Sequence, residues 1–145
     1  SRSLAGMRVG FALGQPDLIA GLERVKNSFN SYPLDMLALA SATAAIEDTA
    51  YFVQTVQQIM NDRDWTTEQL EELDFDVLPS STNFVFARHN RVSGSDLMSY
   101  LRSKNILVRH FTKPGIENHL RITIGTRDEM QALVTALRDY PGIRG

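Results

Sequence analysis

The side chains best suited to binding chemistry in this sequence are three arginines, of which Arg8 comes first. It lies in the opening stretch S-R-S-L-A-G-M-R-V-G-F-A, which has glycines at positions 6 and 10 and is followed by a third at position 14. Glycine lets a backbone turn tightly and approach a ligand closely. A guanidinium is planar and permanently charged, and its N–H donors match the oxygens of a phosphate or carboxylate. This stretch predicts an anion site at Arg8; an ordinary arginine at a strand edge is the alternative.

Arg121 and Arg109 are the other two candidates, and both lie on predicted strands. In L-R-I-T-I, residues 120, 122 and 124 share one face of a strand and Arg121 lies on the other. A long charged side chain on that polar face extends into a cleft or into water. Arg109 ends the apolar run I-L-V-R. A solvated arginine on a sheet is the competing interpretation for Arg121.

The elements that must position these arginines follow from hydrophobic spacing. The first half predicts a strand at 8–13, a helix at 17–29, a break at 27–33, a buried helix at 34–46 and a long helix at 48–73. The break is the most plausible domain linker, and the long helix suggests a spine between domains. Trp65 interrupts the periodicity of that helix and is expected at a joint between segments or against a neighbouring chain.

The second half predicts shorter elements. Strands are expected at 75–78, 83–87, 106–109 and 119–124. Between the second and third strands we expect a helix that Ser93 or Ser95 caps and Asn105 ends. A last helix begins at a capping box of Thr126 and Glu129. This alternation predicts a small α+β domain in which helices cover one face of a mostly antiparallel sheet.

Composition excludes several classes of function. The chain of 145 residues has 15 basic and 17 acidic residues and no cysteine. Its net charge gives no general attraction to nucleic acid or to a membrane surface, and disulfides and thiolate metal sites are impossible. His89, His110 and His119 lack metal-ligand spacing, so we expect no metal site and place all three at the surface. No apolar run approaches the ~20 residues that span a bilayer, so we expect a soluble, cytoplasmic protein.

Three separated motifs resemble one family. They are the opening S-R-S-L-A-G-x-R-V-G-F-A, P-S-S-T-N-F-V-F at 79–86 and L-R-I-T-I-G-T at 120–126. Together, and in this order, they resemble pyridoxal-phosphate (PLP) aminotransferases of fold type I, class I/II, and among them most closely the histidinol-phosphate aminotransferases. The resemblance implies that residues 1–32 end a large cofactor domain, and that 33–145 form bridging helices and the small C-terminal domain.

The resemblance also implies roles for individual residues. Arg8 matches the arginine that grips the cofactor phosphate, and the cofactor-holding lysine of the family would lie immediately before Ser1. Arg121 matches the arginine that holds the α-carboxylate of the amino donor, and Arg109 matches one thought to face the phosphate of the substrate. Asn83 also matches a motif residue, but we expect it to be structural.

The activity implied by the resemblance is transfer of an amino group between glutamate/2-oxoglutarate and histidinol phosphate/imidazole-acetol phosphate in histidine biosynthesis, in a homodimer. Lys26, Lys104 and Lys113 match no family position. We therefore assign no catalytic residue and expect the isolated chain to be inactive and not to bind PLP. The alternative is a free-standing α+β module that binds a small carboxylate or phosphate through Arg109 and Arg121.

Overall fold

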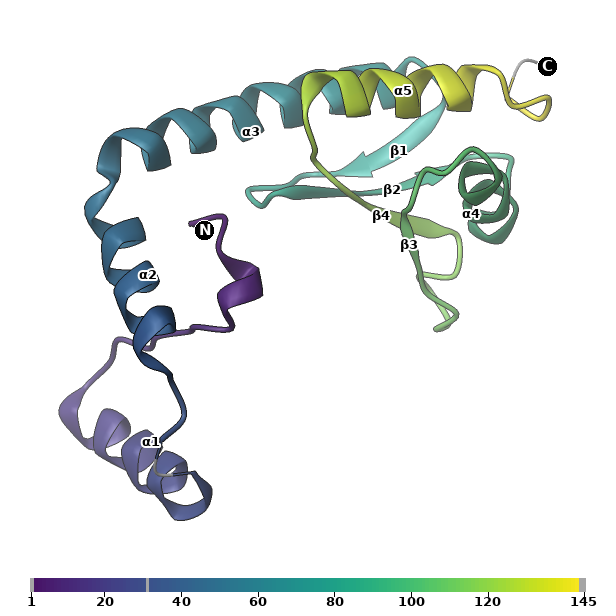
Figure 1. The fold of residues 1–145 in the computed structure, drawn as a ribbon. Coiled ribbons are helices and arrows are strands. Elements are labelled where there is room, and N and C mark those ends of the chain that lie inside the picture. The colour runs from purple at the N-terminus through teal and green to yellow at the C-terminus, as the bar shows by residue number, and fades with distance from the viewer. Residues whose placement is uncertain (1, 31, 144–145) are drawn as a thin grey trace. The chain divides into compact units, whose positions relative to one another are not determined.

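A computed structural model describes residues 2–30 and 32–143 of the chain (Figure 1). It consists of two compact units, Ser1–Thr55 and Val56–Gly145. The helix α3 (Thr49–Glu71) begins in the first unit and ends in the second. The linker predicted at 27–33 includes residue 31, which lies outside the described residues, and both this linker and the boundary predicted after residue 32 remain predictions.

The first unit consists of short helices. A 3-10 turn, η1 (Ala5–Met7), is followed by α1 (Pro16–Phe29), α2 (Met36–Glu47) and the first turns of α3. Pro16 opens α1, where its missing N–H costs nothing, and Asp17 complements the positive end of the helix. Asp35 caps α2 by accepting a hydrogen bond from the backbone N–H of Ala38 at 2.8 Å.

The strand predicted at 8–13 does not form. Residues 9–15 have no regular secondary structure, and Arg8 takes a left-handed backbone conformation with φ 57°. A strand needs a neighbour for its N–H and C=O groups. In the described part of the chain, every paired strand belongs to the other unit.

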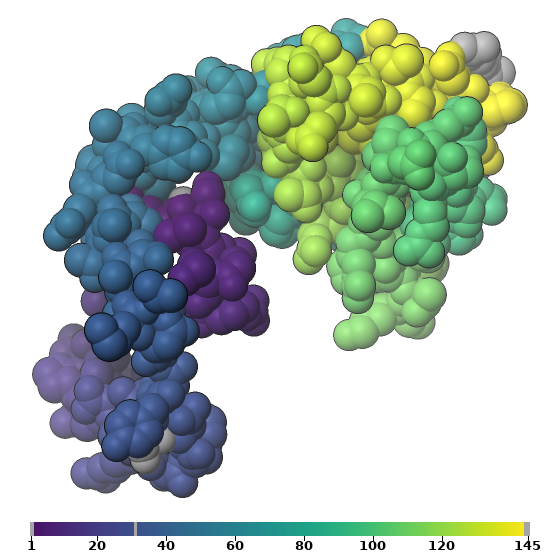
Figure 2. Space-filling view, in the orientation of Figure 1, coloured from purple at the N-terminus to yellow at the C-terminus, as the bar shows by residue number. Residues whose placement is uncertain are grey.

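The predicted burial of the second helix was also wrong. Within α2 only Ala38 is buried, while Met36 is 86% exposed and Leu37 is 76% exposed. The η1 turn lies against α2 (Figure 2) but leaves these side chains uncovered. The alanine-rich composition predicted the helix correctly, because helix propensity is local, whereas burial depends on what packs against the helix.

The second unit contains one antiparallel sheet, which confirms the predicted α+β architecture. The strands are β1 (Phe75–Leu78), β2 (Phe84–His89), β3 (Arg109–His110) and β4 (His119–Thr123), in the spatial order β1-β2-β4-β3. The helices α4 (Gly94–Ser103) and α5 (Arg127–Arg138) complete the unit. Figure 1 shows α5 running beside α3 on one side of this sheet.

The core lies between that face of the sheet and the helices. Alternate residues of the strands are buried with leucines of three helices: Val85, Ala87, Leu120, Ile122, Leu70, Leu97, Leu101, Leu133 and Leu137. Burying each large side chain stabilises the fold by roughly 1.5–3 kcal/mol. The other face of the sheet carries no such layer, and its residues are half-buried or exposed.

Local signals placed the helix ends correctly. The Ser93 hydroxyl accepts from the N–H of Asp96, and Thr126 and Glu129 form the predicted capping box. The third strand is shorter than predicted, because Asn105 turns the chain with φ 62° and the N–H of Ile106 donates to Leu101 O at 2.9 Å to close α4.

Two residues lie elsewhere than the sequence indicated. Trp65 is half-buried against the core of its own unit, with the guanidinium of Arg127 4.5 Å from its ring centroid. His89, expected at the surface, is only 3% exposed. Its Nδ1 accepts hydrogen bonds from the N–H groups of Arg91 and Val92, because its side chain lies on the core face of β2.

Candidate functional site

Two of the three predicted site residues lie opposite each other on neighbouring strands of the sheet. Arg109 on β3 and Arg121 on β4 are Cα partners in the antiparallel ladder. Both side chains are exposed, since the neighbours of Arg121 along β4, Leu120 and Ile122, occupy the core face. Directly opposed residues have Cβ atoms only ~4.5–5.5 Å apart. The fold therefore brings together two permanent positive charges.

Neither of these arginines is neutralised by a carboxylate. Within residues 2–30 and 32–143, no Asp or Glu lies within 4.0 Å of the guanidinium of Arg109 or Arg121. Arg88, an arginine on the same open face, does have such a partner in Asp76, with Nη2 and Oδ2 3.0 Å apart. Like charges placed opposite one another destabilise a sheet. An anion bound between Arg109 and Arg121 would relieve that repulsion.

Aromatic rings surround the arginine pair. Phe84 lies 5.4 Å from the guanidinium carbon of Arg121, and Phe111 lies 5.6 Å from that of Arg109. Phe86, the Cα partner of Arg121 on β2, stacks on His119 with ring centroids 4.7 Å apart. We assigned these phenylalanines no role from sequence. The signal was present, because the two-residue period of a strand places Phe84 and Phe86 on the same open face.

Arg8 lies in the other unit. Its side chain is exposed, and its only hydrogen bond within the described residues runs from Nη1 to Ala5 O at 3.5 Å. The remaining N–H donors of the guanidinium have no protein acceptor there, so they are available to an anion. The left-handed backbone of Arg8 costs ~1–2 kcal/mol for a residue with a Cβ, and such strain concentrates at functional sites.

The three lysines lie on surface elements. Lys26 is in the last turn of α1, and Lys104 follows α4 with its Nζ 5.6 Å from the ring of Tyr100. Lys113 lies in the turn between β3 and β4. None of the three lies within the Arg109–Arg121 site or in the stretch around Arg8.

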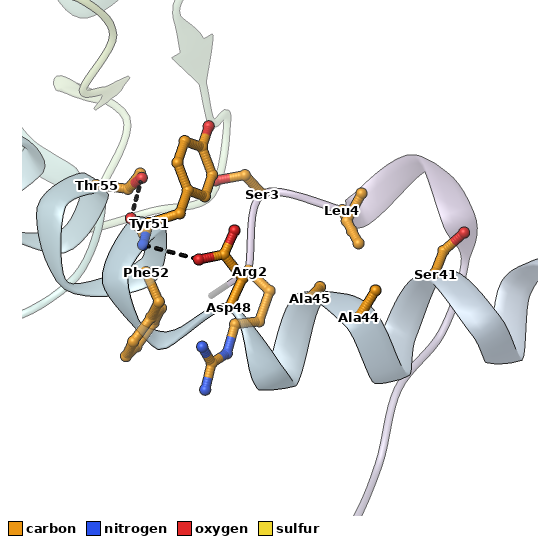
Figure 3. Close-up of a pocket in the computed structure, with 10 residues that line it drawn as sticks. All are labelled: Arg2, Ser3, Leu4, Ser41, Ala44, Ala45, Asp48, Tyr51, Phe52 and Thr55. Atoms are coloured by element: carbon orange, nitrogen blue, oxygen red, sulfur yellow. Dashed lines mark hydrogen bonds between the residues drawn. The ribbon is translucent and has the colours of Figure 1, made fainter.

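The first unit also contains a cavity of about 410 Å³ (Figure 3). It is lined by Arg2, Ser3, Leu4, Ser41, Ala44, Ala45, Asp48, Tyr51, Phe52 and Thr55. The guanidinium of Arg2 lies 3.8 Å from the ring centroid of Phe52, and Asp48 accepts a hydrogen bond from the N–H of Tyr51 at 3.0 Å. This cavity lies where the N-terminal segment crosses the α2–α3 junction, and Arg8 does not line it.

The described residues form neither a metal-binding cluster nor a membrane-spanning helix. No group of three or more His, Cys, Asp or Glu side chains among them is arranged to hold a metal ion. Among the helices they form, none combines the length and apolar character that crossing a membrane requires.

Comparisons with a family model and with curated proteins both indicate an aminotransferase. Residues 1–137 match the family model for aminotransferase class I and II. The chain is 58% identical to histidinol-phosphate aminotransferase 1 of Bradyrhizobium diazoefficiens over 96% of its length, and 56% identical to histidinol-phosphate aminotransferase 2 of Dechloromonas aromatica over 98%. It covers 40% of each relative.

A solved structure has the same fold. Histidinol-phosphate aminotransferase of Sinorhizobium meliloti, in complex with pyridoxal-5'-phosphate, superposes with a TM-score of 0.83 at 26% identity, over 97% of this chain and 38% of that one. The three sequence motifs, the α+β architecture of the second unit and the matching family model all indicate the same family. The chain therefore belongs to the class I and II aminotransferases and has the fold of a segment of a fold-type I enzyme.

Proposed function

We propose that the chain is the C-terminal part of a histidinol-phosphate aminotransferase, which exchanges an amino group between glutamate/2-oxoglutarate and histidinol phosphate/imidazole-acetol phosphate. The structural observation that carries the proposal is the opposed pair of Arg109 and Arg121, which has no carboxylate partner in the described chain. Such a pair suits a substrate that carries a phosphate or carboxylate. The curated relatives, named as histidinol-phosphate aminotransferases, support the same substrate class.

In this proposal PLP supplies an electron sink for the transfer, and Arg8 holds its phosphate. The exposed guanidinium of Arg8, whose one described hydrogen bond is to Ala5 O, supports this role. The lysine that holds the cofactor would lie outside this chain, before Ser1. None of Lys26, Lys104 and Lys113 takes its place.

The two sheet arginines bind and orient the substrate. Arg121 takes the α-carboxylate of the amino donor, and Arg109 takes the phosphate of histidinol phosphate. When histidinol phosphate replaces glutamate, Arg121 must accept a different ligand, because an alcohol replaces the carboxylate. Holding the reacting amino group in a fixed position lowers the entropic part of the barrier.

Three further features belong to the same proposal. The enzyme is a homodimer, and residues 1–32 and 33–145 belong to its large and small domains. It acts in the cytoplasm, as expected for an enzyme of amino-acid biosynthesis. The 145-residue chain alone is inactive and does not bind PLP.

The test compares the 145-residue chain with the full-length coding region. The chain is incubated with PLP and reduced with borohydride; we expect no stable label, and label at a single lysine would contradict the inactive-fragment proposal. The full-length protein should transaminate histidinol phosphate with 2-oxoglutarate. Activity only with other amino acids would overturn the substrate assignment.

A free-standing anion-binding module is the second candidate. It is favoured by one observation, the self-contained core of the second unit beneath the arginine pair. The codons upstream of Ser1 separate the two candidates. A lysine codon directly before Ser1, preceded by a large α/β coding region, supports the enzyme, and a start codon at that place supports the module.

A further inference from the structure

The two guanidiniums of the arginine pair lie beside aromatic rings, whereas Arg88 on the same face of the sheet contacts a carboxylate. Arg121 lies 5.4 Å from the ring centroid of Phe84, and Arg109 lies 5.6 Å from that of Phe111. Both distances fall within the ~6 Å over which a ring face attracts a cation. A ring accepts almost none of the N–H donors of a guanidinium, so those donors remain available to an anion.

Arg88 provides the contrast on the same sheet face. Its Nε donates to Asp76 Oδ2 at 3.1 Å and its Nη2 lies 3.0 Å from the same oxygen. A carboxylate in that position competes directly with an incoming anion, because both use the same donors. A ring can hold a guanidinium without this competition.

The backbone that carries Phe84 is unusually well fixed. The hydroxyls of Ser80 and Thr82 both donate to Phe84 O, at 2.6 and 3.1 Å, and Asn83 O accepts from the N–H of Ile124 at 2.9 Å. These are the hydroxyl and asparagine positions of the motif P-S-S-T-N-F-V-F. The motif thus fixes the backbone at the start of β2, from which Phe84 places its ring beside Arg121.

Phe111 is held by a different contact. It follows β3 directly, and its ring packs edge-on against Phe86, with centroids 6.0 Å apart and planes at 74°. Phe86 is in turn stacked on His119. Such aromatic pairs contribute ~0.5–1.5 kcal/mol beyond their buried area, so the ring of Phe111 is restrained although it lies outside the strand.

We propose that Phe84 and Phe111 are positioning residues for the anion site. Each ring fixes the guanidinium beside it, so that Arg121 and Arg109 stay opposed with their donors available. The inference rests on the anion-binding role that the proposed function gives these arginines. On this sheet Asp76 fixes the guanidinium of Arg88 through an ion pair. In our proposal the two rings fix the guanidiniums of Arg121 and Arg109 instead.

The test titrates inorganic phosphate into the 145-residue chain and follows the arginine Nε–Hε NMR signals. Phe84→Leu should shift the signal of Arg121 by removing the ring current, and should weaken phosphate binding about two- to fivefold, the equivalent of one exposed cation–π contact. Phe111→Leu should do the same for Arg109. Phe84→Tyr, which keeps the ring, should retain both the signal and the affinity.

Arg88→Gln is the matched charge control and should leave phosphate affinity unchanged. If Phe84→Leu and Phe111→Leu both leave phosphate affinity at the wild-type value, the inference is overturned, whether or not the signals move. Failure of the proposed function looks different: Arg121→Gln and Arg109→Gln would then leave phosphate affinity unchanged. In the full-length enzyme Phe84→Leu should lower kcat/KM about two- to fivefold and Phe84→Tyr should restore it; an unchanged kcat/KM in Phe84→Leu would contradict a positioning role.

Discussion

The Nε atom of Arg127 lies 2.8 Å from Oδ1 of Asp62, a carboxylate with no solvent exposure. Asp62 Oδ2 also accepts a hydrogen bond from Gln58 at 2.7 Å, and Arg127 lies over the ring of Trp65. One ion pair thereby joins α3 to the start of α5, directly after β4. A buried charge that loses its partner is costly, since no water replaces the lost contact.

Arg127→Met should therefore destabilise the second unit by ~3 kcal/mol. Urea unfolding followed by the fluorescence of Trp65, the single tryptophan of the chain, measures the change. Arg138→Met is the control, because the pair of Arg138 with Glu72 is exposed and surface pairs contribute only ~0–1 kcal/mol. Equal losses in the two variants would mean that the buried pair adds nothing.

Burial lowers the pKa of His89 below 6.5, with the charge of Asp74 opposing the shift and that of Arg91 adding to it. A histidine whose pKa is lower in the folded state binds fewer protons there than in the unfolded chain. Its stabilising contribution is therefore complete above pH 6.5 and is lost as the pH falls below that value. Unfolding free energies measured between about pH 5 and about pH 8 should decline on the acid side.

The matched variant is His89→Asn, whose side-chain oxygen can accept the N–H groups that now donate to Nδ1. It should be less stable than the parent at neutral pH, because a buried ring is lost. Its stability should depend less on pH below 6.5. An unchanged acid-side slope would assign the dependence to other groups.

The capping box at the start of α5 should contribute measurably to stability. Thr126→Ala removes the hydroxyl that accepts from the N–H of Glu129 and should cost ~1 kcal/mol. Thr135→Ala makes the same substitution at an exposed position within the helix, where alanine is the better helix former. In thermal unfolding, the melting temperature of Thr126→Ala should be lower than that of the parent, and that of Thr135→Ala should be equal or higher. The reverse order would contradict a stabilising capping box.

Gly94 has no room for a side chain. A Cβ there would lie 2.9 Å from backbone atoms of Asn118 and 3.1 Å from the ring of His110. Gly94→Ala should thus separate α4 from the β3–β4 loop and cost ~1–3 kcal/mol. Gly21→Ala in α1 is the control, because a Cβ there meets nothing within 4 Å. It should not lower the helix content measured by circular dichroism. Equal losses of helix content in the two variants would argue against the close contact at Gly94.

Local patterns predicted much of this fold. The helix caps at Ser93 and Thr126 and the alternation along β4 depend on neighbours within a few residues, and the structure confirms them. The exposure of α2 and the absence of a strand at 8–13 could not be predicted from local patterns. Burial of a helix depends on what packs against it, and a strand forms only where another strand pairs with it.

The candidate site was predicted in part for the same reason. The family resemblance pointed to Arg109 and Arg121, but that the two lie opposite each other depends on the register of two strands. The rings of Phe84 and Phe111 were missed, since cation–π contacts have no fixed spacing in sequence. The binding roles of Arg8, Arg109 and Arg121 remain predictions.

The pairing of β4 with β2 has a consequence for how this protein tolerates change. Sliding β4 by a single residue would carry Arg121 into the leucine layer and Leu120 into water, since side chains alternate along a strand. The five residues His119–Thr123 thus carry both core side chains and Arg121, the residue proposed to bind an anion. Variation in length is safest in the loop that precedes them, and an insertion within the strand would damage both at once.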